Sequence, residues 1–195
     1  MTLHKIGIPD EEFIRGNVPM TKQEVRILTL AKAAVAQTDT VLDIGAGTGS
    51  ISIEAALIAT KGKVFAVEKN SDAIGLIKKN ADKFKVKNIT VIEGYAPEAM
   101  PDASEKIDVA FIGGSGGQLG GIIADIDKRM DAGGRIVINA VTLETLGQAS
   151  SVFKERFDGK YAVEVICAQI TRMKKAGGYN LFDALNPVYI FTAKK

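Results

Sequence analysis

Residues 41–50 of this chain read VLDIGAGTGS and carry its most informative local pattern. It begins as a short apolar run, passes through Gly45, Gly47 and Gly49, and continues into a segment with helical character. Glycines in such a turn let the backbone approach a ligand closely and adopt angles that a Cβ would forbid. The stretch therefore predicts a buried strand that leads through a ligand-binding turn into a helix.

Short β-branched runs and helical patterns alternate on both sides of this stretch. The predicted strands are 41–44, 63–68, 89–93, 107–112, 135–141, 161–170 and 187–193. The predicted helices are 22–37, 49–60, 71–84, 118–130 and 142–156, with a short helical turn near 97–100. Alternation of apolar strands with helices is typical of a parallel sheet covered by helices on both faces. The predicted fold class is therefore α/β.

The two ends of the chain depart from this alternation. Residues 171–186 contain two adjacent glycines and are predicted as a polar loop, too short for a parallel crossover. The last two strands should therefore pair antiparallel at one edge of the sheet. Residues 1–21 show no sustained period and are expected to form the N-terminal arm of a single domain, 1–195. Thr21 is predicted to cap the helix that follows, and Glu24 to complete a capping box.

Composition argues against several classes of protein. With 46% hydrophobic and 25% charged residues, the chain is typical of a globular protein. A net charge of +2 disfavours a nucleic-acid partner. Cys167 is the only cysteine, which excludes an intrachain disulfide and a zinc site of several thiolates, and no metal site is predicted. No run approaches the ~20 apolar residues of a membrane span, so we expect a cytoplasmic protein without a membrane partner.

A carboxylate before the glycine turn distinguishes among its possible ligands. Asp43 lies two residues before the first glycine, and Ser50 stands where a dinucleotide fingerprint has its last glycine. The Asp43 carboxylate would repel a pyrophosphate but would suit the ammonium group of S-adenosylmethionine. We therefore predict an S-adenosylmethionine site. A phosphate or dinucleotide site and a purely structural turn are the alternatives.

Two further positions fit the same cofactor. Glu68 ends the second predicted strand, at the place where an acid accepts both ribose hydroxyls in dinucleotide folds. The alternative for Glu68 is a solvated surface carboxylate. After the third strand, Ala96 is predicted to lie beside the adenine.

The sequence resembles the class I, seven-stranded Rossmann-like methyltransferases over essentially its whole length. More specifically, four strings resemble the decarboxylating cobalt-precorrin-6B C15-methyltransferase family of cobalamin biosynthesis. These strings are GIPDEEFIR (7–15), PMTKQEVR (19–26), FIGGSGG (111–117) and GRIVINAVTLET (134–145). The chain resembles the stand-alone form of this unit rather than the form fused within a larger C5,15-methyltransferase.

The resemblance carries implications that composition does not supply. It implies a mostly parallel seven-stranded sheet with an antiparallel edge strand, and a cytosolic homotetramer. It implies S-adenosylmethionine as methyl donor, a tetrapyrrole substrate, methylation at C15 and loss of CO2 from an acetate side chain of ring C. With the motif reasoning above, it places the cofactor contacts on Thr21, Asp43, Gly45, Ala46, Gly47, Thr48, Gly49, Glu68 and Ala96.

A second glycine cluster is predicted to bind the substrate. Residues Gly113, Gly114, Ser115, Gly116 and Gly117 follow the fourth predicted strand and leave little side-chain bulk beside a broad macrocycle. A flexible connector is the alternative. Asn139 is a further candidate, for which packing with a local hydrogen bond is an equal alternative.

The substrate's carboxylates call for basic partners, whereas the chemistry calls for no covalent nucleophile. The basic candidates are Arg15, Lys22, Arg26, Arg172, Lys174 and Lys175, each of which can also be a solvated surface charge. No catalytic residue is assigned. Cys167 is predicted to be buried and inert, and His4 is a poor candidate for a base or a metal ligand.

Two other functions compete with this interpretation. A class I methyltransferase that acts on tRNA adenine or on protein would share the sheet and the glycine loop, although the near-neutral charge argues against tRNA. A module that binds S-adenosylmethionine or a nucleotide without catalysis belongs to a different class, and no sequence feature supports it.

Overall fold

A computed structural model describes residues 6–195, so His4 lies outside the described part of the chain. Its strands are β1 (Thr40–Ile44), β2 (Lys63–Glu68), β3 (Ile89–Glu93), β4 (Val109–Ile112), β5 (Arg135–Ala140), β6 (Ala162–Ala168), β7 (Thr171–Ala176), β8 (Tyr179–Ala184) and β9 (Val188–Lys194). Its helices are α1 (Gln23–Ala33), α2 (Ser50–Ile58), α3 (Ser71–Lys83), α4 (Leu119–Arg129) and α5 (Leu143–Arg156), and a 3-10 helix, Asp10–Glu12, precedes them.

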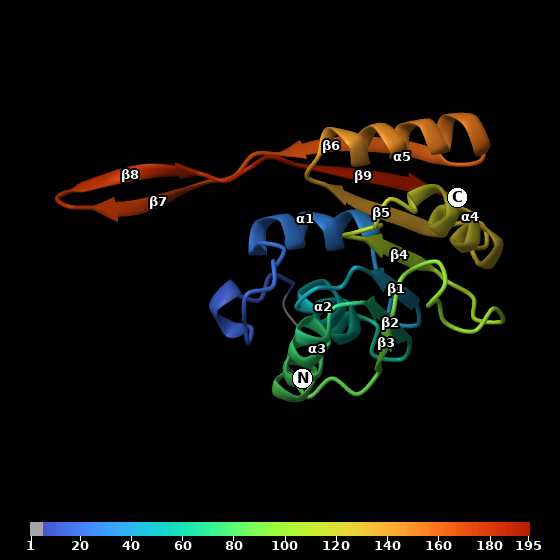
Figure 1. Ribbon diagram of the computed structural model, residues 1–195, viewed down its shortest axis with the longest axis horizontal. Coiled ribbons are helices and arrows are strands. Elements are labelled where there is room, and N and C mark those ends of the chain that lie inside the picture. Colours follow the sequence, from blue (N-terminus) through green and yellow to red (C-terminus); the bar gives the residue numbers. More distant parts are fainter. Residues whose placement is uncertain (1–5) are drawn as a thin grey trace.

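The central sheet has seven strands in the order β3-β2-β1-β4-β5-β9-β6 (Figure 1). Strands β1 to β5 are parallel, and β1 lies between β2 and β4. The chain thus leaves β1 in one direction and returns on its other side, which opens a crevice at the carboxyl ends of β1 and β4. The α/β class and the mostly parallel sheet are confirmed.

The antiparallel strand is not at the edge. Strand β9 pairs antiparallel with β5 on one side and with β6 on the other, so β6 is the outermost strand. The expected antiparallel pairing of the last two sheet strands is confirmed, but the expected antiparallel edge strand is wrong in position. The reason is that β6 leaves a gap beside β5, which the C-terminal strand fills.

Helices cover both faces of the sheet (Figure 1). Val41 in β1 packs in one core cluster with Val25 of α1 and Ala55 of α2. Leu42, the next residue, belongs to the opposite cluster, with Ile122 of α4. Because side chains alternate along a strand, strands β1 to β5 and β9 contribute to both clusters, which explains their continuous apolar sequences.

Helix α1 begins and ends differently from its prediction. Lys22 is its N-cap residue and makes no capping hydrogen bond through its side chain, so the capping box of Thr21 and Glu24 is wrong. The Glu24 carboxylate instead accepts hydrogen bonds from Arg172. The helix ends at Ala33 rather than at residue 37, because Ala34 adopts a left-handed conformation with φ 47°.

Residues 171–184 form a β-hairpin where the sequence analysis predicts a loop. Strands β7 and β8 pair antiparallel, with Ala176 opposite Tyr179 and the two-residue turn Gly177-Gly178 between them. Gly177 has φ 59°, a conformation that favours glycine and is typical of tight hairpin turns. The hairpin projects well beyond the sheet, on the side of α1 and the N-terminal arm (Figure 1).

Three smaller predictions also differ from the structure. Residues 96–99 form turns rather than a short helix, and most other boundaries shift by one to three residues. Cys167 is exposed rather than buried, because its side chain lies on the face of β6 that contributes no residue to either core cluster. Within residues 6–195, no helix combines the length and the apolar character needed to cross a bilayer.

Candidate functional site

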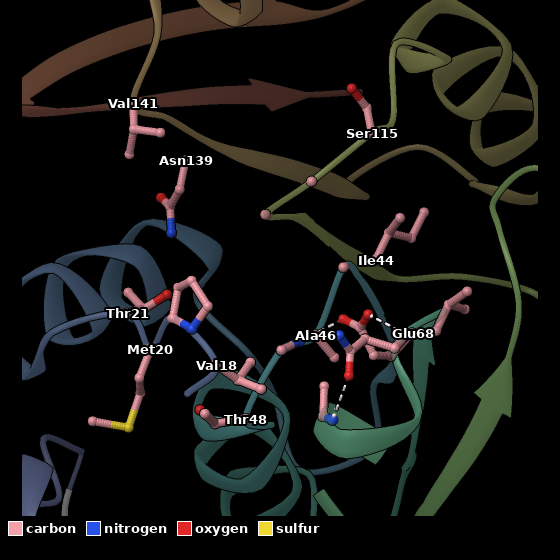
Figure 2. Close-up of a pocket in the computed structure, with 18 of the residues that line it drawn as sticks. Val18, Met20, Thr21, Ile44, Ala46, Thr48, Glu68, Ser115, Asn139 and Val141 are labelled. Carbon is pink, nitrogen blue, oxygen red and sulfur yellow. Dashed lines mark hydrogen bonds between the residues drawn. The ribbon is translucent and has the colours of Figure 1, made fainter. Parts of the chain in front are cut away.

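A cavity of about 570 Å³ opens at the carboxyl ends of the parallel strands (Figure 2). Its size is within the range typical of small-molecule sites. One half is lined by the arm at 18–21, the glycine loop at 45–48, the end of β2 and the 94–96 turn. The other half is lined by the end of β5 and the root of the hairpin. Figure 2 shows Asn139 and Val141 across the cavity from Ala46 and Glu68.

The two glycine segments form the junction between these halves. Gly45 has φ 69°, and a Cβ on it would lie 2.8 Å from the backbone nitrogen of Gly114. The loop is fixed to β2, because the amides of Gly45 and Ala46 both donate to the carbonyl of Val67. Gly49 lies behind the loop against Ile77 and does not line the cavity. Glycine is therefore required at Gly45 by both conformation and contact.

Glu68 lies in the cavity wall with its carboxylate satisfied by backbone amides. One oxygen accepts from Gly47 at 2.8 Å, and the other accepts from Lys69 and Asn70 at 2.9 Å each. The side chain is 8% exposed. These bonds fix the carboxylate at the end of β2, beside the glycine loop, as the sequence predicts, and they exclude a freely solvated glutamate.

Asp43 lies beneath the loop rather than in the cavity wall. Its carboxylate is buried and accepts a hydrogen bond from the Ser52 hydroxyl of α2. Burial, opposed by the Ser52 bond and reinforced by the charge of Glu68, raises the pKa of Asp43 from 3.8 to about 6. The sequence analysis predicts a contact between Asp43 and an ammonium group. In the structure this side chain points toward α2, because it alternates with the cavity-side residue Ile44, and it does not line the cavity.

The arm closes the cofactor half of the cavity. A Cβ on Gly47 would lie 3.2 Å from the carbonyl oxygen of Pro19, so arm and loop are in contact. Thr21, which is predicted to contact the cofactor, lines the cavity, and so do its neighbours Val18 and Met20. The buried hydroxyl of Thr48, also in the wall, has no hydrogen-bond partner among the described residues. An unpartnered buried hydroxyl in a cavity wall indicates a place for a polar ligand.

The second half of the cavity is mostly apolar. Asn139 lies there and accepts a hydrogen bond from the Thr29 hydroxyl at 3.0 Å, which is the local bond that the sequence analysis left as an alternative. The rest of this half is lined by residues that the sequence analysis did not select: Val141, Ile170, Leu185, Asn186 and Val188. Several of them flank the hairpin. If Gly177-Gly178 had been recognised as a hairpin turn, both ends of the hairpin would have been placed near the carboxyl ends of the parallel strands.

The cavity collects most of the predicted site residues. Those in its wall are Thr21, Gly45, Ala46, Gly47, Thr48, Glu68, Ala96, Gly113, Gly114, Ser115, Gly116 and Asn139, whereas Asp43, Gly49 and Gly117 lie outside it. Two basic side chains, Lys22 and Lys69, belong to the described wall. Lys69 lies over the Tyr95 ring at 4.8 Å, on the cofactor side.

Two of the basic candidates are engaged elsewhere. Arg26 is fully buried and pairs with Asp10 and Glu54, so it is not available to a substrate carboxylate. Arg172 pairs with Asp10 and Glu24 outside the cavity wall. Their spacing along the sequence gave no sign of these partners, which come from the arm, from α1 and from α2.

Comparison with known proteins agrees with this architecture. A tRNA (m1A58) methyltransferase structure from Aquifex aeolicus, 16% identical, superimposes with a TM-score of 0.74 over 93% of this chain and 72% of that one, which shows the fold alone. A structure from Geobacter metallireducens, described as a precorrin-6Y C5,15-methyltransferase, is 44% identical and gives a TM-score of 0.89 over 97% of each chain.

Two curated relatives match over nearly their whole length. A Sulfurisphaera tokodaii protein, named as a probable cobalt-precorrin-6B C(15)-methyltransferase (decarboxylating), is 45% identical over 97% of both chains. A Salmonella typhimurium protein with the same activity in its name is 36% identical over 95% of both chains. The precorrin methyltransferase domain matches residues 12–195. This chain therefore belongs to the precorrin methyltransferase family.

Proposed function

We propose that this chain transfers a methyl group from S-adenosylmethionine to C15 of cobalt-precorrin-6B, with loss of CO2, in cobalamin biosynthesis. Relatives that it matches end to end carry this activity in their names. The observation that carries the proposal is one continuous cavity in which the glycine loop and Glu68 face a mostly apolar half at the end of β5. A methyl donor and a broad acceptor need such adjoining halves.

The residues of the first half fit S-adenosylmethionine. Gly45 and Gly47 leave a cradle that a Cβ would fill, and the Thr48 hydroxyl offers an unpartnered polar atom. When bound, the cofactor supplies an electrophilic methyl group. Glu68 accepts the ribose hydroxyls with its remaining lone pairs, because each carboxylate oxygen can accept more than one bond. Ala96, buried in the wall, contacts the adenine.

The remaining cofactor residues act by shaping this half. Thr21 faces the glycine loop from the arm, and Ala46 and Thr48 supply loop surface. Gly49 lets α2 begin against Ile77. Asp43 contributes a negative charge beneath the loop and holds Ser52, rather than touching the cofactor directly.

The second half takes the tetrapyrrole. Gly113, Gly114, Ser115 and Gly116 present backbone rather than bulky side chains, and the apolar residues at the hairpin root suit the flat face of a macrocycle. Lys22 binds one of the substrate's carboxylates, and Asn139 offers an amide while its carbonyl oxygen accepts from Thr29. These residues orient the acceptor carbon in line with the donated methyl group and exclude water, which supplies much of the rate without a nucleophile.

The active assembly in this proposal is a homotetramer. The hairpin exposes Phe182 at 89%, Tyr179 at 76%, Met173 at 61% and Leu181 at 50% of their surface. Met173 and Phe182 lie opposite each other on one face of the hairpin, and Leu181 and Tyr179 lie on the other, so both faces expose large apolar side chains of the kind that mark interaction sites. The outer edge of β6 exposes Val163 and Val165 as well, and an unpaired strand edge favours association. Closed symmetry between copies would cover these surfaces.

Incubation with cobalt-precorrin-6B and methyl-labelled S-adenosylmethionine tests the function directly. The proposal expects label in the corrinoid at C15 and one equivalent of CO2 for each methyl group transferred. Parallel reactions with bulk tRNA and with protein extract control for the competing methyltransferase activities. Label in RNA or protein but not in the corrinoid, or cofactor binding without any transfer, would refute the proposal.

A further inference from the structure

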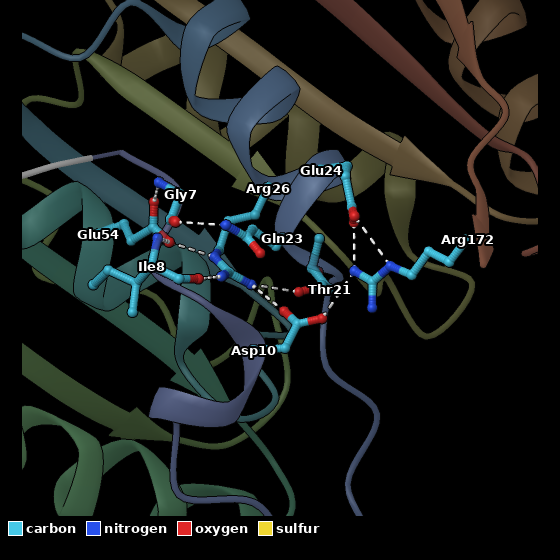
Figure 3. Close-up of polar contacts among 9 residues, drawn as sticks. All are labelled: Gly7, Ile8, Asp10, Thr21, Gln23, Glu24, Arg26, Glu54 and Arg172. Carbon is cyan, nitrogen blue, oxygen red and sulfur yellow. Dashed lines mark hydrogen bonds and ion pairs between the residues drawn. The ribbon is translucent and has the colours of Figure 1, made fainter. Parts of the chain in front are cut away.

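A buried ion network joins the N-terminal arm to the body of the protein (Figure 3). At its centre is Arg26 of α1, with 0% of its surface exposed. Its guanidinium donates to Glu54 of α2 and, at 3.2 Å, to Asp10 of the arm. A buried guanidinium needs all its donors satisfied, so these contacts fix the arm's position closely.

The same network holds the arm backbone at two separated points. Near the start, Glu54 accepts from the amides of Gly7 at 2.8 Å and Ile8 at 3.0 Å, and Arg26 donates to the carbonyl of Ile8. At the end, Arg26 donates to the carbonyl of Thr21 at 2.7 Å. Between these points the arm runs over the glycine loop and lines the cofactor half of the cavity. The network therefore sets where that wall lies.

Between the two anchors, Asn80 of α3 holds the arm independently. Its side chain accepts from the amide of Ile14 at 2.8 Å and donates to the carbonyl of Ile14 at 3.1 Å. The same amide group donates to the carbonyl of Thr48 in the glycine loop at 3.1 Å. The arm segment that lines the cavity is thus suspended between Asn80 and Arg26.

The hairpin reaches this network through one residue. Arg172 of β7, 40% exposed through its side chain, donates to Asp10 at 3.3 Å and pairs with Glu24 of α1. Asp10 thereby bridges Arg172 and Arg26. Without Arg172, Asp10 and Glu24 would lose the cation that they share, and repulsion between these two carboxylates would push the arm away from α1.

We infer that Arg172 is a positioning residue, through which the projecting hairpin sets the N-terminal arm and so the affinity of the pocket for S-adenosylmethionine. The inference rests on the proposed function only for the identity of the ligand. A change in the hairpin would then alter cofactor affinity, although the glycine loop and Glu68 belong to other parts of the chain.

The test replaces Arg172 while leaving the buried Arg26 in place, so that the fold is kept. Arg172→Gln should raise the Kd for S-adenosylmethionine by about two- to thirty-fold, the range typical of coupling through intermediate residues. In the free protein, the Gly7 and Ile8 amides should exchange hydrogen faster. The Ile14 amide, held by Asn80, serves as an internal reference and should change less. Arg172→Lys should restore part of the affinity.

Lys174→Gln is the matched control, because it removes the same charge from the same face of β7. The nearest acid partner of Lys174 is Asp183 on the hairpin itself, at 3.9 Å. Wild-type affinity and exchange in this control, together with the changes in Arg172→Gln, would support the inference. Unchanged affinity in Arg172→Gln, or equal weakening in both variants, would overturn it. The exchange measurement needs no ligand, so a wild-type protein that failed to bind the cofactor would count against the proposed function alone.

Discussion

Gly45 and Gly114 meet across the crevice between β1 and β4, so closely that a Cβ on Gly45 would lie 2.8 Å from the Gly114 nitrogen. The relation is one-sided. A Cβ built on Gly114 meets no heavy atom within 4 Å, so it points into open space. Substitution at the two positions should therefore have different consequences, because one would disturb the cofactor loop and the other would fill the space beside it.

Gly114→Val should impair corrinoid turnover while leaving cofactor binding within about threefold of wild type, because its side chain occupies the substrate half. Steady-state kinetics and calorimetry on the same preparation measure the two effects. Gly147→Val on α5, where a Cβ also meets open space, is the control for the substitution itself. Turnover preserved in Gly114→Val would remove this loop from the substrate site.

Glu68→Ala should weaken S-adenosylmethionine binding by about 1.5 to 3 kcal/mol, the usual cost of a lost charge-assisted hydrogen bond. Isothermal calorimetry measures the change after thermal melting has shown that the variant is folded. Glu93→Ala is a close control, because Glu93 lies opposite Glu68 on the neighbouring strand β3 and is exposed outside the cavity wall. Wild-type affinity in Glu68→Ala would contradict the cofactor assignment.

Lys22→Met should raise the KM for the corrinoid by about tenfold or more, because it removes a charged partner of a carboxylate. The Kd for S-adenosylmethionine should stay near the wild-type value. Lys69→Met, on the cofactor side of the same cavity, should leave the corrinoid KM unaffected. If the two variants behave alike in corrinoid kinetics, Lys22 is not the substrate's carboxylate partner.

Asp43→Asn should make the protein more stable relative to wild type as the pH rises. Burial raises the pKa of Asp43 from 3.8 to about 6, so the folded protein retains a proton that the unfolded chain releases between pH 4 and pH 6. The contribution of Asp43 to the free energy of unfolding of the wild-type protein therefore falls as the pH rises through that window. It does not recover at higher pH. A shift of about two pKa units corresponds to roughly 3 kcal/mol.

Urea unfolding of both proteins at pH 4, 5, 6 and 8 measures this difference. The free energy of unfolding of Asp43→Asn minus that of wild type should grow up to about pH 6 and then level off. Asparagine keeps an oxygen that can accept from Ser52, so the local hydrogen bond need not be lost. If the difference in free energy of unfolding between the two proteins does not change with pH, burial does not raise the pKa of Asp43.

The wild-type protein should scatter light as a particle of about 83 kDa, four times the chain mass of 20.7 kDa, because the apolar hairpin needs cover. Phe182→Asp should reduce the mass, since a charge would have to be buried in the interface. Lys175→Asp, on the same hairpin but without apolar surface, is the control. A particle of about 20 kDa at micromolar wild-type concentration would contradict the assembly.

Local patterns allowed much of the fold to be predicted from the sequence. The strands of the parallel sheet are continuous apolar runs, and Gly45, Gly47 and Gly49 mark the turn after β1 because few other residues tolerate that backbone. Glu68 could be placed in the site from its position at a strand end, whereas Thr21 was placed there through the resemblance to the family. These features depend on residues close together in the chain.

Long-range partners account for what could not be predicted. Arg26 looks like a surface base in the sequence, and its burial depends on Glu54 and on an arm that folds back across α2. Asp43 occupies the expected strand position, but the alternation of side chains directs it beneath the loop. The hairpin at 171–184 could not be predicted from a buried apolar stripe, because its large apolar side chains are exposed and do not face the protein's own core.

The position of β9 has a consequence for synthesis of the protein on the ribosome. Strand β9, which follows β6 in the sequence, lies between β5 and β6, so β6 cannot join the sheet until residues 188–194 have also been translated. Until then β5 is an open edge, and the nascent domain lacks the pairing that closes its core beneath α5. Folding of this half of the sheet must therefore await the emergence of residues 188–194 from the exit tunnel, and chains that lack these residues should be cleared by proteases rather than accumulate.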